Sequence, residues 1–101
     1  MKVSRTDIPG LLIIEPDVYK DDRGYFFESF SKKRYKEFGI PDELVQDNIS
    51  KSKRGTVRGL HYQVGEYAQG KLCHVIEGEV LDVAVDIRFN SPTSKTSHSI
   101  T

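Results

Sequence analysis

The segment Gly55–Gln63 and the nearby Lys71 carry the side chains of this sequence that are best suited to chemistry. The segment contains a guanidinium on Arg58 and an imidazole on His61, and Lys71 adds an ammonium on the next extended stretch. An imidazole can act as a general base near neutral pH, and fixed cations stabilise an oxyanion as it forms. This combination indicates proton abstraction next to a carbonyl group on an anionic substrate.

The spacing of these side chains requires a bend in the chain. Arg58 and His61 are three residues apart, so they point to opposite faces of an ideal strand. Gly59 between them could form a bulge or bend that directs both into one cavity. Each residue also has an ordinary structural interpretation, because a lone histidine in a strand is often structural and Lys71 could be a solvated strand end.

A metal site is not favoured by the pattern. Two imidazoles at the spacing of metal ligands would form His-x-His, but here Gln63 stands two residues after His61. Cys73 and His74 are adjacent and would face opposite ways in a strand. Cys73 is the single cysteine, so an internal disulfide is impossible, and we predict that it is a small core residue in a strand.

Further polar and aromatic side chains could bind a ligand. Arg23, in a turn before an aromatic strand, is either solvated or a bidentate ligand for phosphate. Phe26 is either a core residue or a surface on which a nucleobase or sugar could stack. The segment Gln46-Asp47-Asn48 offers amide and carboxylate groups for hydrogen bonds, although a hydrogen-bonded strand crossing would use the same groups. Asp82 lies on the more polar face of its strand and could brace Lys71 or His61.

Length and composition limit the classes of protein. The 101 residues form one domain by size, and apolar residues make up 37% of the chain. Fifteen basic residues balance fifteen acidic ones, which gives no support to nucleic-acid or membrane-surface binding. No apolar run is long enough to span a bilayer, and the N-terminus lacks a signal-peptide pattern. We therefore expect a cytoplasmic protein.

The first part of the chain predicts a hairpin and a short helix. An apolar strand from Leu11, interrupted by Pro16, is followed by the turn Asp21–Gly24 and an aromatic strand, Tyr25–Phe30. Ser31 is a suitable N-cap, and Gly39 and Pro41 would end a helix over residues 32–38.

The rest of the chain predicts strands separated by glycine-containing turns, typical of an antiparallel sandwich or barrel. One strand alternates cleanly, with Leu81, Val83, Val85 and Ile87 on one face and Val80, Asp82, Ala84 and Asp86 on the other. The predicted strands are Leu44–Ser50, Thr56–Gln63, Lys71–Ile76, Glu79–Arg88 (paired with the preceding one around Glu77-Gly78) and Ser97–Thr101.

Read in order, these segments resemble the N-terminal half of the RmlC-type dTDP-4-dehydrorhamnose 3,5-epimerases. The matching blocks are Asp22-Arg-Gly24, Phe27-Glu28, Gln46-Asp-Asn48, Arg58-Gly-Leu-His-Tyr-Gln63, Tyr67-Ala-Gln-Gly-Lys71 and Asp82-Val-Ala-Val-Asp86-Ile-Arg88. The resemblance implies a cupin-type double-stranded β-helix (a jelly roll), a homodimer that exchanges N-terminal strands, and catalysis without a metal or organic cofactor.

The resemblance also implies an activity and roles for individual residues. The family epimerises C3 and C5 of dTDP-4-dehydro-6-deoxy-D-glucose, giving dTDP-4-dehydro-L-rhamnose on the way to dTDP-L-rhamnose. By this resemblance, His61 is the base and Lys71 holds the 4-keto oxygen. The nucleotide-sugar would be bound, partly across the dimer, by Arg23, Glu28, Gln46, Asp47, Asn48 and Arg58.

The family is nearly twice as long as this chain, and its second half provides the acid, a tyrosine, and the carboxylate that orients the histidine. We therefore expect either a truncated product or a divergent short member. The alternative function is a non-catalytic half-cupin that binds a nucleotide-sugar or only associates with itself. The activity of a related 3,4-ketoisomerase is less favoured, because such an enzyme would be expected to carry His-x-His where this chain has His61-Tyr-Gln63.

Overall fold

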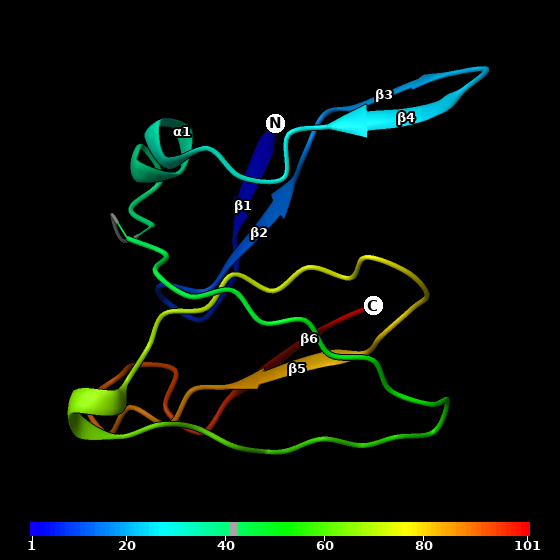
Figure 1. Ribbon diagram of the computed structural model, residues 1–101. Coiled ribbons are helices and arrows are strands. Elements are labelled where there is room, and N and C mark those ends of the chain that lie inside the picture. Colours follow the sequence, from blue (N-terminus) through cyan, green and yellow to red (C-terminus); the bar gives the residue numbers. More distant parts are fainter. Residues whose placement is uncertain (41–42) are drawn as a thin grey trace. The chain divides into compact units, whose positions relative to one another are not determined.

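The computed structural model describes residues 1–40 and 43–101, which form two compact units. The first unit comprises Met1–Ser31 and His74–Thr101, and the second comprises Lys32–Cys73. Figure 1 shows the elements, which are β1 (Lys2–Arg5), β2 (Leu12–Glu15), β3 (Val18–Asp21), β4 (Gly24–Phe27), α1 (Lys32–Lys36), a 3-10 turn η1 (Gly65–Tyr67), β5 (Asp82–Val85) and β6 (Ser97–Ile100).

The first unit contains three separate two-stranded antiparallel ladders, β1–β2, β3–β4 and β5–β6. In β1–β2, Lys2 is opposite Glu15 and Arg5 is opposite Leu12. Strand β1 was not expected from the sequence. Thr6 stabilises the connection that follows it, since its Oγ1 accepts a hydrogen bond from Ile8 N at 3.2 Å and lies 3.0 Å from the Leu11 carbonyl oxygen.

The predicted hairpin at the turn Asp21–Gly24 is confirmed. The prediction of one buried strand from Leu11 to Tyr19 is wrong, because β2 and β3 belong to different ladders and β3 is exposed. Strand β3 pairs with β4 so that Val18 is opposite Phe27 and Asp21 is opposite Gly24. Gly24 has a φ of +140°, a backbone conformation that glycine adopts readily because it has no Cβ. On one face of β4, Tyr25 stacks with Phe27 at a centroid distance of 6.1 Å, and the edge of His74 meets Phe27 at 5.5 Å.

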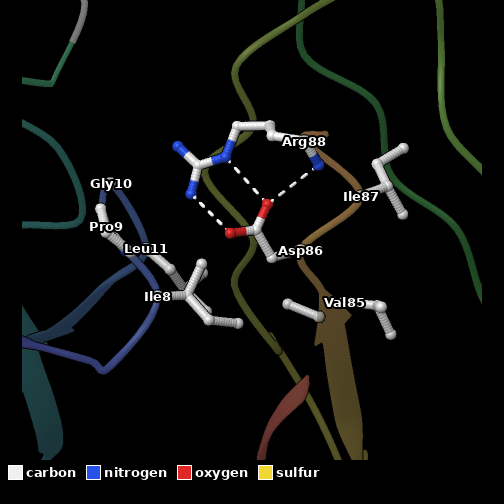
Figure 2. Close-up of a pocket in the computed structure, with 9 residues that line it drawn as sticks. Ile8, Pro9, Gly10, Leu11, Val85, Asp86, Ile87 and Arg88 are labelled. Atoms are coloured by element: carbon white, nitrogen blue, oxygen red, sulfur yellow. Dashed lines mark hydrogen bonds and ion pairs between the residues drawn. The ribbon is translucent and has the colours of Figure 1, made fainter. Parts of the chain in front are cut away.

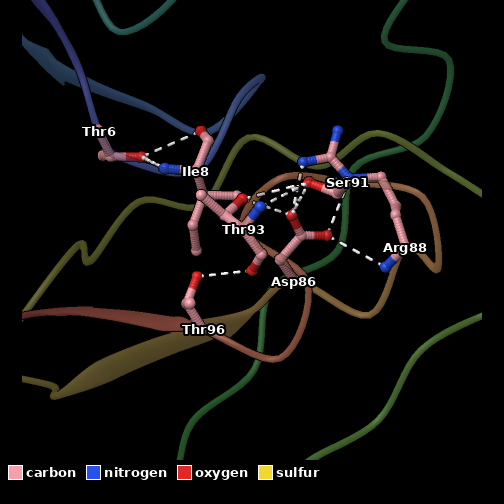
Figure 3. A network of polar contacts seen from close by, with 7 residues as sticks. All are labelled: Thr6, Ile8, Asp86, Arg88, Ser91, Thr93 and Thr96. Atoms are coloured by element: carbon pink, nitrogen blue, oxygen red, sulfur yellow. Dashed lines mark hydrogen bonds and ion pairs between the residues drawn. The ribbon is translucent and has the colours of Figure 1, made fainter.

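The ladder β5–β6 is closed by a turn organised around Asp86, whose carboxylate accepts hydrogen bonds from three side chains (Figure 3). Arg88 donates from Nε and Nη2, both at 2.9 Å, and its backbone N–H donates at 3.1 Å. The hydroxyls of Ser91 and Thr93 donate at 2.5 and 2.7 Å. The backbone of Asp86 also pairs with Lys95 and Thr96, so one buried residue joins both ends of the turn.

The second unit contains the predicted helix, which is shorter than expected. Helix α1 begins directly after Ser31 and ends at Lys36 rather than residue 38. Gly39, with a φ of +79°, donates its N–H to the Lys36 carbonyl, and Ile40 N–H donates to the Tyr35 carbonyl, so the chain turns out of the helix there. Pro41, the other expected helix terminator, lies outside the described residues.

Three predicted strands are wrong as paired strands, and two others are shorter than predicted, since the aromatic strand Tyr25–Phe30 is observed as β4, which ends at Phe27. The segments Leu44–Ser50, Thr56–Gln63 and Lys71–Ile76 are described without strand pairing, and β5 covers only Asp82–Val85 of the predicted Glu79–Arg88. A strand is defined by hydrogen bonds to a neighbour, and no neighbour within the described part of the chain pairs with these segments. The predicted strand at Ser97–Thr101 is confirmed as β6.

The hydrophobic core of the described chain is thin. Among the described residues, Ile8 and Tyr35 are the buried apolar side chains, whereas Leu81, Val83 and Ile87 of the predicted apolar face are exposed. The prediction that Cys73 is a core residue in a strand is wrong, because Cys73 is exposed and unpaired with any strand. Exposed apolar side chains occur both in the unpaired segments, such as Val57 and Leu60, and in the isolated ladders, such as Phe26 and Val83, because a two-stranded ladder without a packed face covers few side chains.

The Asp86 turn predicts a specific sensitivity to acid. The Arg88 guanidinium, followed by the Ser91 and Thr93 hydroxyls, holds the pKa of Asp86 far below its ordinary value of 3.8. In the unfolded chain that value is restored, so the unfolded state binds the proton first as the pH falls. The contribution of Asp86 to stability should therefore be complete above about pH 5 and decrease progressively below about pH 4.

We expect Asp86→Asn to lower the melting temperature at neutral pH and to reduce the loss of stability between about pH 5 and about pH 2. Circular dichroism melts across this range measure both effects. Asp82→Asn, the same change of charge at the exposed first residue of β5, is the matched control. Equal melting curves for the two variants would contradict the role given to Asp86.

Candidate functional site

The three side chains expected to do chemistry lie in the second unit and are exposed. Arg58, His61 and Lys71 lie on extended chain on either side of the turn η1. Gly59 has a φ of +110°, which departs from strand geometry. That Arg58 and His61 face one cavity stays a prediction. Within the described residues, neither a hydrogen bond nor an ion pair engages these three side chains. Their charges and ring nitrogens are therefore available to a ligand.

The amide segment of the same unit has a defined local arrangement. Gln46 Nε2 donates a hydrogen bond to Asn48 Oδ1 at 3.3 Å. Residues two apart on extended chain share one side, so the pair presents its remaining donors and acceptors together. Asp47, between them, alternates to the other side.

Arg23 of the first unit is held by a neighbouring carboxylate. Its Nε and Nη2 donate to Asp21 Oδ2 at 3.2 and 2.6 Å, and its backbone N–H donates to Oδ1 at 2.8 Å. The hydrogen bond with Arg23 lowers the pKa of Asp21, and the same contact raises the pKa of Arg23. Both side chains are exposed, so water screens this pair, and a phosphate could compete for the guanidinium.

Other predicted ligand-binding residues of the first unit are exposed. Phe26 is 71% exposed and lies opposite Tyr19 in the β3–β4 ladder, so it is a surface residue rather than a core residue. Glu28 follows β4 and is exposed. Asp82 is opposite Ile100 at the start of β5. Bracing of Lys71 or His61 by Asp82 stays a prediction.

A cavity of about 250 Å³ lies elsewhere in the first unit (Figure 2). The loop between β1 and β2 forms one side, and the end of β5 with the Asp86–Arg88 pair forms the other. Its apolar walls and the fully engaged carboxylate of Asp86 provide packing and not chemistry. The lining residues are Ile8, Pro9, Gly10, Leu11, Ala84, Val85, Asp86, Ile87 and Arg88.

The Asp86 turn is not predicted from the sequence. The alternation of residues places Asp86, like Asp82, on the more polar face of a predicted strand. A signal was present, because Asp86-Ile-Arg88 is followed by Ser91 and Thr93 around a proline. Short side chains with hydroxyl groups in a proline turn commonly bond to a nearby carboxylate or backbone group.

The described residues contain no group of three or more histidine, cysteine, aspartate or glutamate side chains placed to hold a metal ion. None of the described helices has the length and apolar character needed to cross a membrane.

Comparison with known proteins decides the family. A sequence model of the dTDP-4-dehydrorhamnose 3,5-epimerases matches residues 5–101. The chain belongs to this epimerase family. It is 57% identical over 94 residues to dTDP-4-dehydrorhamnose 3,5-epimerase of Shigella flexneri and 55% identical over 94 residues to that of Salmonella typhimurium, covering 92% of this chain in both cases.

Solved epimerase structures share this backbone. The Legionella pneumophila enzyme in complex with dTDP-4-keto-L-rhamnose has a TM-score of 0.92 and 53% identity, over 98% of this chain and 53% of its own. The Bacillus anthracis enzyme with TDP and PPi bound has a TM-score of 0.91 and 42% identity, over 98% of this chain and 57% of its own. The mainly β fold is thus that of the cupin-type epimerases. The chain spans about half the length of the curated relatives that it matches.

Proposed function

We propose that this chain carries the proton-abstracting and nucleotide-sugar-binding residues of a dTDP-4-dehydrorhamnose 3,5-epimerase. The substrate would be dTDP-4-dehydro-6-deoxy-D-glucose and the product dTDP-4-dehydro-L-rhamnose. The observation that carries the proposal is the pair of exposed, unengaged groups on His61 and Lys71, in a chain that matches the epimerase family over residues 5–101. The solved relative with dTDP-4-keto-L-rhamnose bound supports the choice of ligand.

The proposed chemistry follows from the acidity of protons next to a ketone. A proton at C3 or C5 is acidic because the electron pair left behind delocalises onto the 4-keto oxygen. The imidazole of His61 takes the proton, and the ammonium of Lys71 stabilises the enolate oxygen. Return of a proton from the opposite face inverts the carbon. The resemblance assigns that step to a tyrosine in the half of the family that this chain does not span.

The nucleotide-sugar is bound in this proposal by cations and amides. Arg23 and Arg58 would contact phosphate oxygens, for which a guanidinium is well shaped. Phe26, being exposed, can stack on a base or sugar. Polar contacts would come from Glu28, Gln46, Asp47 and Asn48.

We also propose that the chain forms a homodimer with strand exchange. The unpaired segments present backbone donors and acceptors that another strand could satisfy. The apolar face of Leu81, Val83 and Ile87 is exposed and would be covered by association.

A second candidate function is a non-catalytic half-cupin that binds a nucleotide-sugar or only associates with itself. Its support is the length of the chain, which covers 52% of the Shigella relative. Product formation separates the two candidates, because binding and association require no second half.

The first prediction concerns the base. Incubated with substrate in deuterated water, the chain should exchange protons at C3 or C5 slowly, since the resemblance assigns the reprotonating acid to a tyrosine in the half of the family that these residues do not match. His61→Asn should slow that exchange by about a hundredfold or more while binding is retained, because asparagine cannot accept a proton near neutral pH. NMR measures the exchange, and chromatography measures the epimerised product.

His98→Asn in β6 is the matched control and should leave exchange unchanged. Exchange that persists in His61→Asn would remove His61 from the role of base. Full-rate epimerisation by the 101-residue chain would contradict our assignment of the second proton transfer to residues beyond it.

The second prediction concerns phosphate recognition. Arg23→Ala should weaken dTDP binding by roughly ten- to a hundredfold, since a charge-assisted bidentate contact is lost. Asp21→Asn should strengthen binding by up to about fivefold, because Arg23 no longer bonds to a neighbouring carboxylate.

Calorimetry with dTDP measures both effects, and Asp22→Asn is the control for the loss of one negative charge from the same turn. If Asp21→Asn and Asp22→Asn change the affinity for dTDP equally, the cause is the lost negative charge of the turn and not the lost hydrogen bond between Asp21 and Arg23. Unchanged affinity in Arg23→Ala would show that Arg23 is a solvated turn residue.

The third prediction concerns association. Light scattering at micromolar concentration should detect a dimer or larger assembly, and Val83→Glu should shift the population toward smaller species. The physical reason is that a charge on the apolar face of β5 disfavours its burial. A stable, well-folded monomer of the parent chain would contradict this account.

A further inference from the structure

The imidazole of His61 lies beside Gly59 in a position that a side chain at residue 59 would crowd. A Cβ placed ideally on Gly59 would lie 3.3 Å from His61 Nδ1, 3.4 Å from the His61 backbone nitrogen and 3.9 Å from Cε1. A Cβ contact of 3.0–3.4 Å is tighter than nine in ten real ones, so the ring would have to shift by a few tenths of an ångström to admit a methyl group. The Nδ1 edge of the ring therefore lies beside the space that a side chain at residue 59 would occupy.

The contact distinguishes Gly59 from similar glycines. In the described part of the chain, six other glycines have positive φ, and a Cβ at any of them would meet no atom within 4 Å. Those positions require glycine for backbone conformation only. Gly59, with a φ of +110°, has both the backbone requirement and the contact with His61.

The contact restricts the imidazole in a way that matters for proton transfer. No hydrogen bond holds the exposed His61 ring within the described residues, and the ring direction seen in the structure is one that a side chain at residue 59 would crowd. A base acts only when its nitrogen is within hydrogen-bond reach of the proton, and small displacements of a reacting group are costly in rate.

We propose that Gly59 is a positioning residue: because it has no side chain, it leaves room for the imidazole of His61 and so permits the direction from which the ring reaches the substrate. The proposal rests on the proposed function, in which His61 is the base. It assigns to Gly59 no contact with the substrate.

The contact itself can be tested in the unaltered chain. The nuclear Overhauser spectrum should show cross-peaks between the Gly59 α-protons and the Hε1 proton of the His61 ring. His61→Asn identifies the ring signal, and the rings of His74 and His98 provide internal references. Absence of these cross-peaks, while the ring shows those to its own β-protons, would overturn the proposal without the need for a glycine variant.

The consequence is tested with a matched pair of variants, Gly59→Ala and Gly55→Ala. Both place alanine at a positive φ, +110° and +82°, but only the methyl group at residue 59 meets the ring. Gly59→Ala should shift the His61 ring signals and slow deuterium exchange at saturating substrate by about a hundredfold, with the affinity for dTDP retained. Gly55→Ala should show only the smaller effect of shared backbone strain.

Equal His61 shifts and equal exchange rates in the two variants would overturn the positioning role. This failure differs from failure of the proposed function, which would appear as exchange that persists in His61→Asn. If Gly59→Ala does not fold while Gly55→Ala does, the cross-peaks of the parent chain decide the question.

Discussion

Each ladder of the first unit depends on a polar side chain that hydrogen-bonds its own turn. Thr6 bonds within the loop after β1, Asp21 bonds to the backbone of Arg23 between β3 and β4, and Asp86 organises the turn between β5 and β6. Isolated two-stranded ladders are only marginally stable in water, and this core buries few apolar side chains. Closure of the turns by these residues therefore has to provide much of the order of the unit.

This dependence on turns explains which elements could be predicted from the sequence. The turn Asp21–Gly24 carries its own signal, an aspartate that bonds forward and a glycine that accepts positive φ, so the hairpin followed directly. The helix after Ser31 and strand β6 were also predictable from local residues. The segments Leu44–Ser50 and Thr56–Gln63 have strand composition, but pairing requires a partner strand that local residues do not specify.

In the candidate site, likewise, the residue types could be predicted from the sequence, but the contacts between their side chains could not. The residue types that can abstract a proton and hold an oxyanion, His61 and Lys71, were evident from the segment itself, and the resemblance to the epimerases supplied their roles. The engagement of Arg23 by Asp21 was not predicted, because alternation along the chain does not show which neighbour a long side chain will reach. The approach of Gly59 to the His61 ring depends on backbone angles that a glycine in a sequence permits but does not specify.

The central claim is that this chain, which spans about half of its relatives, retains the residues that recognise a nucleotide-sugar. The most direct measurement is a titration of isotopically labelled protein with dTDP, followed by NMR of its side chains. The account predicts saturable shifts of the Nε–H signals of Arg23 and Arg58 and of the amide groups of Gln46 and Asn48, all with one dissociation constant. Absence of shifts at these groups, or shifts confined to the residues around the Asp86 cavity, would contradict it.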